Sequence, residues 1–431
     1  MRTALALSVA ALVVCSAVAR AQDRTLNLEI GDPARKGREA PVRLDGITDT
    51  ATGAALSPAG LARQLAGVQI VFVGESHTSI EFHNAQRRLI EELSRTGRQV
   101  LIGLEMYPSP EQPFLDQWVD GLLTEDGFLT LSRWYRNWGY NWRYYRDIFV
   151  FARDHRIRMH AVNAPRDIVT AVRLKGFSGL SPEQAALIPA RVDIDHADHR
   201  ALFKAYLDEG GGMMAGMGAE MFEGMFRAQC TWDATMAYNA VQALQKSGDP
   251  NAIMVVLIGS GHVAYGLGAE RQAALWFKGR TASIIPTPVA DDQGRPQIVR
   301  ASYANFIWGV PPELAPAYPA LGVSFREAGK GTDALPVINV ERSSVAAAAG
   351  VRVGDQLVSL DGVATRDRET ANRLIADKRW GDTATLVVRR AGETVTLAVT
   401  FARTLPPPGA RPATPPIRLC PAIFHGLDPA E

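Results

Sequence analysis

The sequence predicts an α/β domain in which a mainly parallel sheet is flanked by helices, followed by a smaller domain rich in strands. Three apolar runs, at 68–74, 99–105 and 252–259, are rich in Val, Ile and Leu, as are strands buried on both faces of a parallel sheet. Helical patterns separate these runs, near 80–96 and from about 195 to 246. Such alternation is typical of parallel strands joined by helical crossovers.

The remaining elements follow in order along the chain. Helical segments are expected through 111–155, then a strand at 158–163 and a helix near 165–175. From about 321 the pattern changes to short strands with one or two helices, which predicts a separate small β-barrel or sandwich. Within it, four alanines and a glycine at 346–350 indicate a short helix that ends at the glycine.

Length and composition bound the domain organisation and the classes of partner. A chain of 431 residues, 47% of them hydrophobic, is expected to form two or three domains. Its formal net charge of +1 argues against nucleic acid as a partner. The expected segments are a signal peptide at 1–21, an N-terminal arm at 22–59, the α/β domain at 60–300, a linker at 301–320, the small domain at 321–403 and a Pro-rich tail at 404–431.

The N-terminus has the features of a secretory signal peptide. An apolar run at 4–14 follows Arg2, and Ala19-Arg20-Ala21 fits the small-x-small cleavage rule. We expect cleavage after Ala21 and export, which places the protein in the periplasm or at the outer membrane. Lipidation of Cys15 is not expected, because a valine precedes it where a small residue is needed.

Two cysteines, Cys230 and Cys420, remain after this cleavage. An oxidising compartment permits a disulfide, but whether these two pair is left open. No CxxCH haem-attachment motif and no CxxC zinc pair occurs in the chain.

Polar side chains stand at the ends of the three apolar runs. Glu75 and His77 follow the first run, Glu105 ends the second, and His262 follows the third. Ligands of open α/β sheets bind outside the carboxyl ends of the strands, so these four side chains are expected to share one cleft, with His83 facing it from the next helix. Two imidazoles and two carboxylates suit a haem, an acid–base centre, or a divalent metal held by His77, Glu105 and His262.

The segment 134–146, WYRNWGYNWRYYR, is densely aromatic. Its rings could stack on a flat apolar ligand. The spacing of Trp134, Trp138 and Trp142 suits a buried helix face equally well, and we expect core packing to be its main role.

Six segments together resemble the ChaN-like proteins of the haem-binding uptake and Tiki superfamily. They are GESHTSIEFH, GLEMYPSPEQPFLDQW, WGYNWRYYRDIFVFAR, AVNAPRDIV, AQCTWDATMA and IGSGHVAYGLG, and they span roughly 60–290. The resemblance implies a ChaN-type α/β domain of an exported or lipid-anchored protein linked to haem or iron uptake. It also implies haem at the strand-end cleft, in some relatives between two monomers, so that a homodimer is possible here.

The same resemblance assigns residues. Arg166, at a strand end after Pro165, could bind a propionate as a two-pronged donor, and Tyr107 is a possible phenolate ligand of iron. With His77, His83 and His262 these form the expected haem-binding set. The motif residues of the family fall on Glu75, His77, His83, Glu105, Asn163, Arg166, Gln229, Asp233 and His262.

Residues 321–401 resemble a bacterial PDZ domain. LGVSF would supply the carboxylate-binding loop and the peptide-docking strand, and SSVAAAAGVRVGDQLVSLDG matches the helix, strand and turn that follow. A PDZ domain captures an extended peptide by adding it as a strand. The residues expected to hold the peptide are Leu321, Gly322, Val323 and Phe325.

Two functions therefore remain open at the level of sequence. In the first, the cleft holds haem or iron, and the PDZ domain recruits a peptide or protein. In the second, which relatives in the wider superfamily suggest, Glu75 or Glu105 acts as a general base. His77 and His262 would then activate water, alone or through a metal. Both functions need the same residue types.

Overall fold

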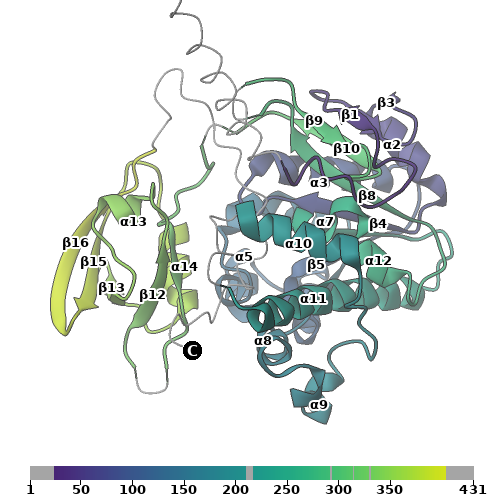
Figure 1. Ribbon diagram of the computed structural model, residues 1–431. Helices are drawn as coiled ribbons and strands as arrows, with labels where there is room; N and C mark the ends of the chain where they lie inside the picture. The colour runs from purple at the N-terminus through teal and green to yellow at the C-terminus, as the bar shows by residue number, and fades with distance from the viewer. Residues whose placement is uncertain (1–23, 210–216, 292–293, 314, 330–331, 404–431) are drawn as a thin grey trace, which may run out of the picture.

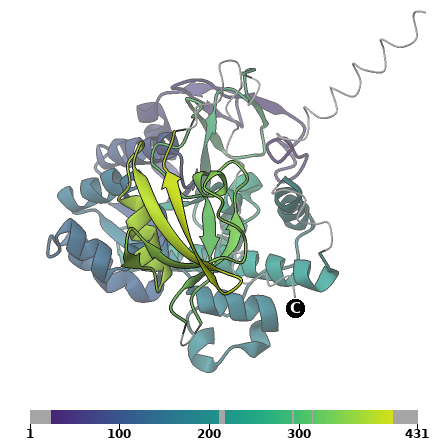
Figure 2. The same ribbon diagram turned by 90° about the vertical axis from the view of Figure 1, so that its left-hand side faces the viewer.

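The computed structural model of the protein describes residues 24–209, 217–291, 294–313, 315–329 and 332–403. It contains a larger α/β domain and a smaller domain of strands, which lie side by side (Figures 1 and 2). The expected signal peptide, the question of Cys15, the Pro-rich tail and Cys420 fall outside the described residues.

The sheet of the larger domain contains eight of the described strands in the order β3-β2-β10-β8-β4-β7-β5-β6. The six from β10 to β6 run parallel, and β2 and β3 are antiparallel additions at one edge. The bounds are β2 Ile47–Asp49, β3 Ala55–Leu56, β4 Ile70–Glu75, β5 Val100–Pro108, β6 Arg158–Asn163, β7 Ile253–Gly259, β8 Thr281–Pro288 and β10 Phe306–Val310.

Alternating side chains of these strands enter two cores, one on each face of the sheet. In β4, Val71 and Val73 pack into one core, whereas Ile70 and Phe72 pack into the other. Helices on the first face are α2 Pro58–Gln64, α3 Ile80–Ser94, α4 Gln112–Val119, α5 Glu125–Leu131, α6 Trp134–Asn137 and α7 Arg146–Asp154. Helices on the second face are α8 Arg166–Lys175, α10 Ala197–Glu209, α11 Ala219–Lys246 and α12 Ala269–Ala273.

This architecture confirms the predicted helix-flanked, mainly parallel sheet. Because β7 lies between β4 and β5, and because Glu75 is in register with Gly259, the three apolar runs of the sequence are direct neighbours and end at the same edge. The shorter elements are α9 Pro182–Ala185, η1 Leu65–Gly67, η2 Ser109–Glu111, η3 Trp142–Tyr144, η4 Phe177–Gly179, η5 Ser260–His262 and η6 Ala264–Gly266.

Two predicted boundaries were wrong. The expected linker at 301–320 contains β10, whose Phe306, Ile307 and Trp308 are buried between β2 and β8; the linker prolines begin only after this strand. The expected N-terminal arm supplies β2 and β3 to the same sheet, and β1 Glu39–Pro41 pairs with β9 Ile298–Arg300. Short strands of two to five residues carry too little periodicity to be recognised before their partners are known.

The smaller domain has its own sheet and its own core. Its sheet runs β11-β12-β13-β15-β16, with β14 paired to β13, and its strand pairs are antiparallel. The core is formed by residues such as Phe325, Leu335 and Leu386. The bounds are β11 Val323–Phe325, β12 Leu335–Val340, α13 Val345–Ala348, β13 Gln356–Leu360, β14 Val363–Ala364, α14 Arg368–Ala376, β15 Thr383–Arg390 and β16 Glu393–Thr400.

Helix α14 forms the contact between the domains. It lies on the face of the small domain that is turned toward the large one (Figure 1). Asn372 Nδ2 donates to the carbonyl of Tyr135 at 3.0 Å, and Asn141 Nδ2 donates to the carbonyl of Ala376 at 3.1 Å. Each domain thus caps a backbone carbonyl of the other. Across the described ranges, no helix has both the length and the apolar character that crossing a bilayer requires.

Candidate functional site

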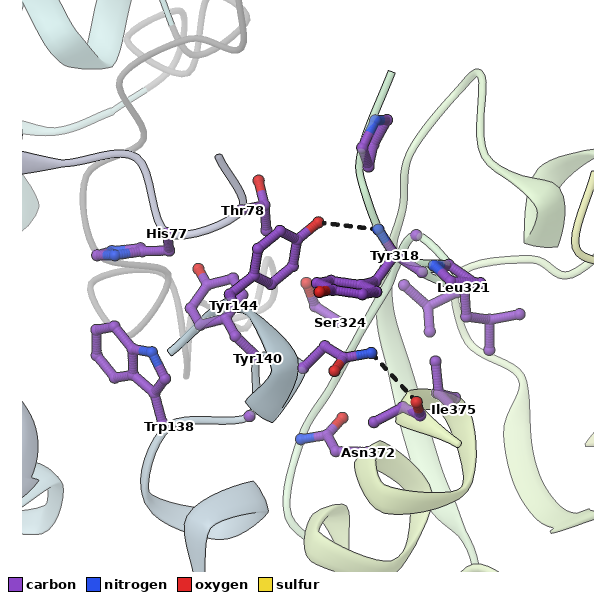
Figure 3. Close-up of a pocket in the computed structure, with 18 of the residues that line it drawn as sticks. His77, Thr78, Trp138, Tyr140, Tyr144, Tyr318, Leu321, Ser324, Asn372 and Ile375 are labelled. Atoms are coloured by element: carbon purple, nitrogen blue, oxygen red, sulfur yellow. Dashed lines mark hydrogen bonds between the residues drawn. The ribbon is translucent and has the colours of Figure 1, made fainter. Parts of the chain in front are cut away.

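A cavity of about 340 Å³ lies between the two domains. Figure 3 draws His77 and Trp138 on the side of the large domain, and Leu321 and Ile375 on the side of the small one. The residues that line the cavity include Glu75, His77, Trp138, Tyr140, Tyr144, Arg166, Tyr318, Leu321, Gly322, Val323, Phe325, Arg368 and Ile375. The size is that of a site for one small-molecule ligand.

Glu75, the last residue of β4, is a buried carboxylate with three hydrogen-bond donors. His77 Nδ1 and the Tyr145 hydroxyl donate to Oε1 at 2.9 and 2.7 Å, and Gln86 Nε2 donates to Oε2 at 2.8 Å. Burial alone would raise the pKa of Glu75. The charge of His83 and the hydrogen bond from His77 outweigh that effect and lower it to about 2. Glu75 therefore stays ionised and fixes its neighbours.

His77 is the histidine that reaches the cavity. Since its Nδ1 donates to Glu75, the neutral ring keeps its lone pair on Nε2, and no residue that the structure describes hydrogen-bonds to that atom. Trp138 packs edge-on against the ring at 4.7 Å between centroids, and Tyr140 lies at 5.0 Å. Histidines that bind metals usually donate their other ring N–H to a carboxylate in this way, and the carboxylate fixes the orientation of the ring.

His83 does not face the cavity, contrary to expectation. Its Nδ1 lies 3.1 Å from Gln86 Oε1, and its Nε2 lies 3.3 Å from the carbonyl of His77. It packs beside Tyr145 at 4.2 Å between centroids. His83 therefore supports the loop that carries His77 rather than offering a free nitrogen.

Glu105 and His262 belong to a second buried cluster. His262 Nδ1 donates to Asp233 Oδ1 at 2.5 Å, and its Nε2 lies 3.5 Å from Glu105 Oε1. Burial opposes the imidazolium, but the charge and hydrogen bond of Asp233, together with Glu105, raise the pKa of His262 to about 10. Gln229 Nε2 also donates to Asp233, at 3.3 Å. This histidine is therefore a cation enclosed by carboxylates.

The two clusters meet at Gly259. Its backbone N–H donates to Glu105 Oε2 at 2.6 Å. A methyl group in place of its hydrogen would lie 3.1 Å from His77 Cε1 and 3.5 Å from Glu105 Oε2. A larger residue at this position would therefore require the His77 ring to shift by a few tenths of an ångström. The structure thus brings all four strand-end residues together, but only Glu75 and His77 line the cavity.

The aromatic segment 134–146 serves both of its expected roles. Trp134 and Trp142 are buried in the core, 4.9 Å apart between ring centroids. Trp138, Tyr140 and Tyr144 line the cavity, and Trp138 and Tyr144 also belong to the same core.

The structure does not support Tyr107 as an iron ligand. Its ring is fully buried among Phe128, Trp134 and Phe149, and its hydroxyl hydrogen-bonds to Ser132 Oγ at 2.7 Å. Burial raises the pKa of Tyr107 well above its ordinary value, which disfavours the phenolate that iron would need. Strand β5 continues past Glu105 to Pro108, so the side chain of Tyr107 points into the aromatic core.

Two other residues that the family resemblance assigned, Asn163 and Arg166, have a structural role and a place in the cavity wall, respectively. Asn163 Nδ2 donates to the carbonyl of Glu105 at 2.7 Å, which ties the ends of β5 and β6 together. Arg166, the first residue of α8, lines the cavity. Its Nη2 donates to the carbonyl of Asn137 at 2.9 Å, and its buried Nη1 finds no hydrogen-bond partner among the described residues.

The predicted peptide-binding residues Leu321, Gly322, Val323 and Phe325 line the same cavity. Gly322 has a φ of +74°, and a methyl group there would lie 2.2 Å from Ser344 Cβ, so the loop requires glycine. Strand β11 is the edge of its sheet. A peptide strand can pair with such an edge.

Several residues of the site were not predicted. Gln86 and Tyr145 hold Glu75 but follow it by 11 and 70 residues. Tyr318 packs edge-on against Tyr144 at 4.8 Å, and its N–H donates to the Tyr144 hydroxyl at 3.3 Å (Figure 3). Arg368 comes from the other domain. The helical position of Gln86, one turn after His83, was a usable signal; for the others the sequence held none.

The predicted alternative of a divalent metal at His77, Glu105 and His262 is not supported. Among the residues that the structure describes, no group of three or more His, Cys, Asp or Glu side chains is placed to hold a metal ion. His262 faces Asp233 and Glu105 as a cation, and a metal ligand must be deprotonated. Cys230, the one cysteine within the described ranges, is a buried free thiol.

Comparison with known families identifies both domains. Residues 61–272 match the family described as haem-binding uptake, Tiki superfamily, ChaN, and residues 319–401 match the PDZ domain. The chain carries a ChaN-like haem-binding domain followed by a PDZ domain. This confirms the two resemblances drawn from the sequence. Comparison with curated protein sequences gives no match.

Solved structures give weaker similarities. ChaN of Campylobacter jejuni, solved with cofacial haem binding, shares 16% identity over 62% of this chain and 98% of that one, with a TM-score of 0.48. The HtrA-type protease AlgW with a decapeptide shares 26% identity over 21% of this chain, with a TM-score of 0.19. A serine endoprotease from Yersinia pestis shares 20% identity over 20%, with a TM-score of 0.18. The chain spans about 30% of the length of these two proteases.

Proposed function

We propose that the protein is an exported haem-binding protein that takes part in iron uptake, in which His77 is the iron ligand and the PDZ domain recruits a peptide. The observation that carries the proposal is the pairing of His77 with Glu75. His77 Nδ1 donates to an ionised carboxylate, and Nε2, which belongs to a residue that lines the cavity, has no hydrogen-bond partner among the described residues. A carboxylate on Nδ1 orients an imidazole so that Nε2 can bind a metal.

The residues around His77 fit a haem. Trp138, Tyr140 and Tyr144 offer ring surfaces to a flat macrocycle, and the unpartnered Nη1 of Arg166 offers a donor to a propionate. Bound there, haem would supply an iron centre to the protein. Glu75 would orient His77, while Gln86 and Tyr145 hold Glu75 in place.

The geometry favours binding over the hydrolase alternative. A general base needs an oxygen that can take a proton from a substrate in the cavity. Both oxygens of Glu75 already accept hydrogen bonds, and its pKa of about 2 makes it a weak base. Glu105 does not line the cavity and receives the N–H of Gly259. Export and iron uptake rest on the signal-peptide pattern of 1–21 and on the family of the ChaN-like domain.

Haemin titration tests the ligand assignment. The full-length mature protein should give a Soret band with haemin, and His77→Ala should weaken the binding by at least about tenfold and shift the band. His155→Ala is the matched control, because His155 is exposed and stacks only on Phe151. Identical spectra and affinities for wild type and His77→Ala would remove His77 as the ligand.

The PDZ proposal rests on the loop at Leu321, Gly322 and Val323 and on the free edge of β11. A peptide with apolar side chains and a free C-terminal carboxylate should bind more tightly than its C-terminal amide, because backbone N–H groups of the loop face an anion. Fluorescence anisotropy with the two peptides measures the difference. Equal binding would contradict carboxylate capture, and binding only after deletion of 404–431 would indicate that the tail competes for the groove.

A further inference from the structure

Two arginines from different domains line the cavity. Arg166 opens α8 in the ChaN-like domain, at the end of β6, and Arg368 opens α14 in the PDZ domain. They are 202 positions apart in the sequence, and only the docking of α14 against α6 brings them to one site. The pair is therefore a product of the domain arrangement.

Neither guanidinium has its hydrogen-bonding capacity filled. The Nη1 of Arg166 is buried and has no partner among the described residues. No hydrogen bond or ion pair joins Arg368 to another residue that the structure describes. Buried N–H donors without partners are rare in folded proteins, because each costs desolvation free energy. The buried Nη1 of Arg166 on the cavity wall therefore indicates a missing acceptor, and Arg368, which is only partly buried, adds a second charge to the same wall.

The two charges also act on each other. Burial, and then the nearby charges of Arg166 and Arg136, lower the pKa of Arg368 to about 10, while Glu327 acts in the opposite direction. Glu75, which also lines the cavity, accepts hydrogen bonds from His77, Tyr145 and Gln86 rather than from either arginine. An anion between the two guanidiniums would relieve this repulsion.

We infer that Arg166 and Arg368 form one carboxylate site built by both domains, and that it holds a propionate of the haem. The inference rests on the function proposed above. A planar guanidinium binds a carboxylate with two parallel hydrogen bonds, so the pair can grip one propionate from two sides. The PDZ domain then forms part of the haem site, and a haem held by His77 also fastens α14 to the ChaN-like domain. The C-terminal carboxylate of a peptide is the competing anion, because the loop at Leu321 borders the same cavity.

Haemin and haemin dimethyl ester distinguish a propionate contact from general packing. Arg368→Gln should weaken haemin binding by about tenfold, the effect expected from losing one charge-assisted pair. The Soret position should not change, since Arg368 does not touch the iron. The diester lacks the carboxylates, so wild type and Arg368→Gln should bind it equally. Arg366→Gln is the matched control: it removes the same charge from an exposed position two residues away.

The outcomes separate this inference from the proposed function. Haemin binding by wild type with an unchanged Arg368→Gln affinity overturns the inference alone, as does an equal loss of affinity for haemin and for the diester. Failure of wild type to bind haemin overturns both. If Arg368→Gln binds haemin normally but binds a peptide with a free C-terminus less tightly, the arginines bind the peptide carboxylate, and the propionate assignment is overturned. Wild type should bind haemin more tightly than the dimethyl ester. This comparison needs no substitution, so it remains a test even if a variant folds poorly.

Discussion

His77 and His262 follow the same sequence pattern, an apolar strand and then glycine, yet the structure gives them opposite roles. Both lie at the carboxyl edge of the sheet, on neighbouring strands. His77 has one carboxylate partner and an open nitrogen at the cavity. His262 has Asp233 on one nitrogen and Glu105 near the other, and does not line the cavity. The number of carboxylates around the ring decides between a ligand and a structural cation.

The largest effect should come from removing the partner of His262. Asp233→Asn leaves a buried imidazolium without its main counter-charge, and breaking such a buried pair costs about 3–5 kcal/mol. Urea denaturation of the apoprotein should show this loss in the free energy of unfolding. Asp147→Asn, at a side chain that is 71% exposed, should change it by no more than about 0.5 kcal/mol. Similar values for the two variants would mean that His262 is not charged.

The pH dependence of stability should also separate the two histidine clusters. The folded pKa of His262 is about 10, above its ordinary 6.5. Its contribution is therefore fully present below about pH 6.5 and is lost as the pH rises through about 10. Glu75 has the opposite sign: its pKa falls from 4.5 to about 2, so its contribution is present above about pH 4.5 and is lost as the pH falls through about 2.

Unfolding free energies of wild type and His262→Gln, measured from pH 6 to pH 10.5, test the first window. The difference between the two proteins should shrink as the pH rises. A difference that stays constant over that range would contradict the raised pKa of His262. For Glu75→Gln, the difference in unfolding free energy from wild type should become smaller as the pH falls from 5 to 2.5.

Tyr107→Phe should lower the stability of the aromatic core without changing haem binding. It removes the hydrogen bond to Ser132 and should cost about 1 kcal/mol of stability. The Soret band and the haemin affinity should remain those of wild type, because Tyr107 lies away from the cavity. A spectral change comparable to that of His77→Ala would restore Tyr107 as a ligand.

The smallest effect should be the linkage between the two ligands. His77 and the loop at Leu321 border one cavity of about 340 Å³, so haem and a peptide side chain compete for space. Haem should lower peptide affinity by roughly fivefold, and the peptide should lower haem affinity by the same factor, as binding equilibria require. Anisotropy titrations with and without haemin measure it. Unchanged affinity in both directions would show that the two sites do not overlap.

The sequence alone determined the main elements and the first layer of the site. The apolar runs are nearly continuous in Val, Ile and Leu, which is typical of buried parallel strands. A parallel sheet places the strand ends together, and this predicted the shared edge of Glu75, His77, Glu105 and His262. The PDZ loop was equally readable, because Gly322 in LGVSF marks a local backbone requirement. The short strand β10 was missed, since five apolar residues directly before Pro311 and Pro312 give little periodicity.

Only the tertiary structure decided which of these residues reach a ligand. His262 has two carboxylates beside it where His77 has one, and Asp233 lies 29 residues from its histidine on helix α11. The direction of a side chain past the strand end separates Tyr107 from the cavity, and domain docking places Arg368 beside Arg166. Such contacts depend on distances between elements far apart in the chain. Local residue patterns determine secondary structure and burial, but they do not show which distant carboxylate will lie beside which histidine.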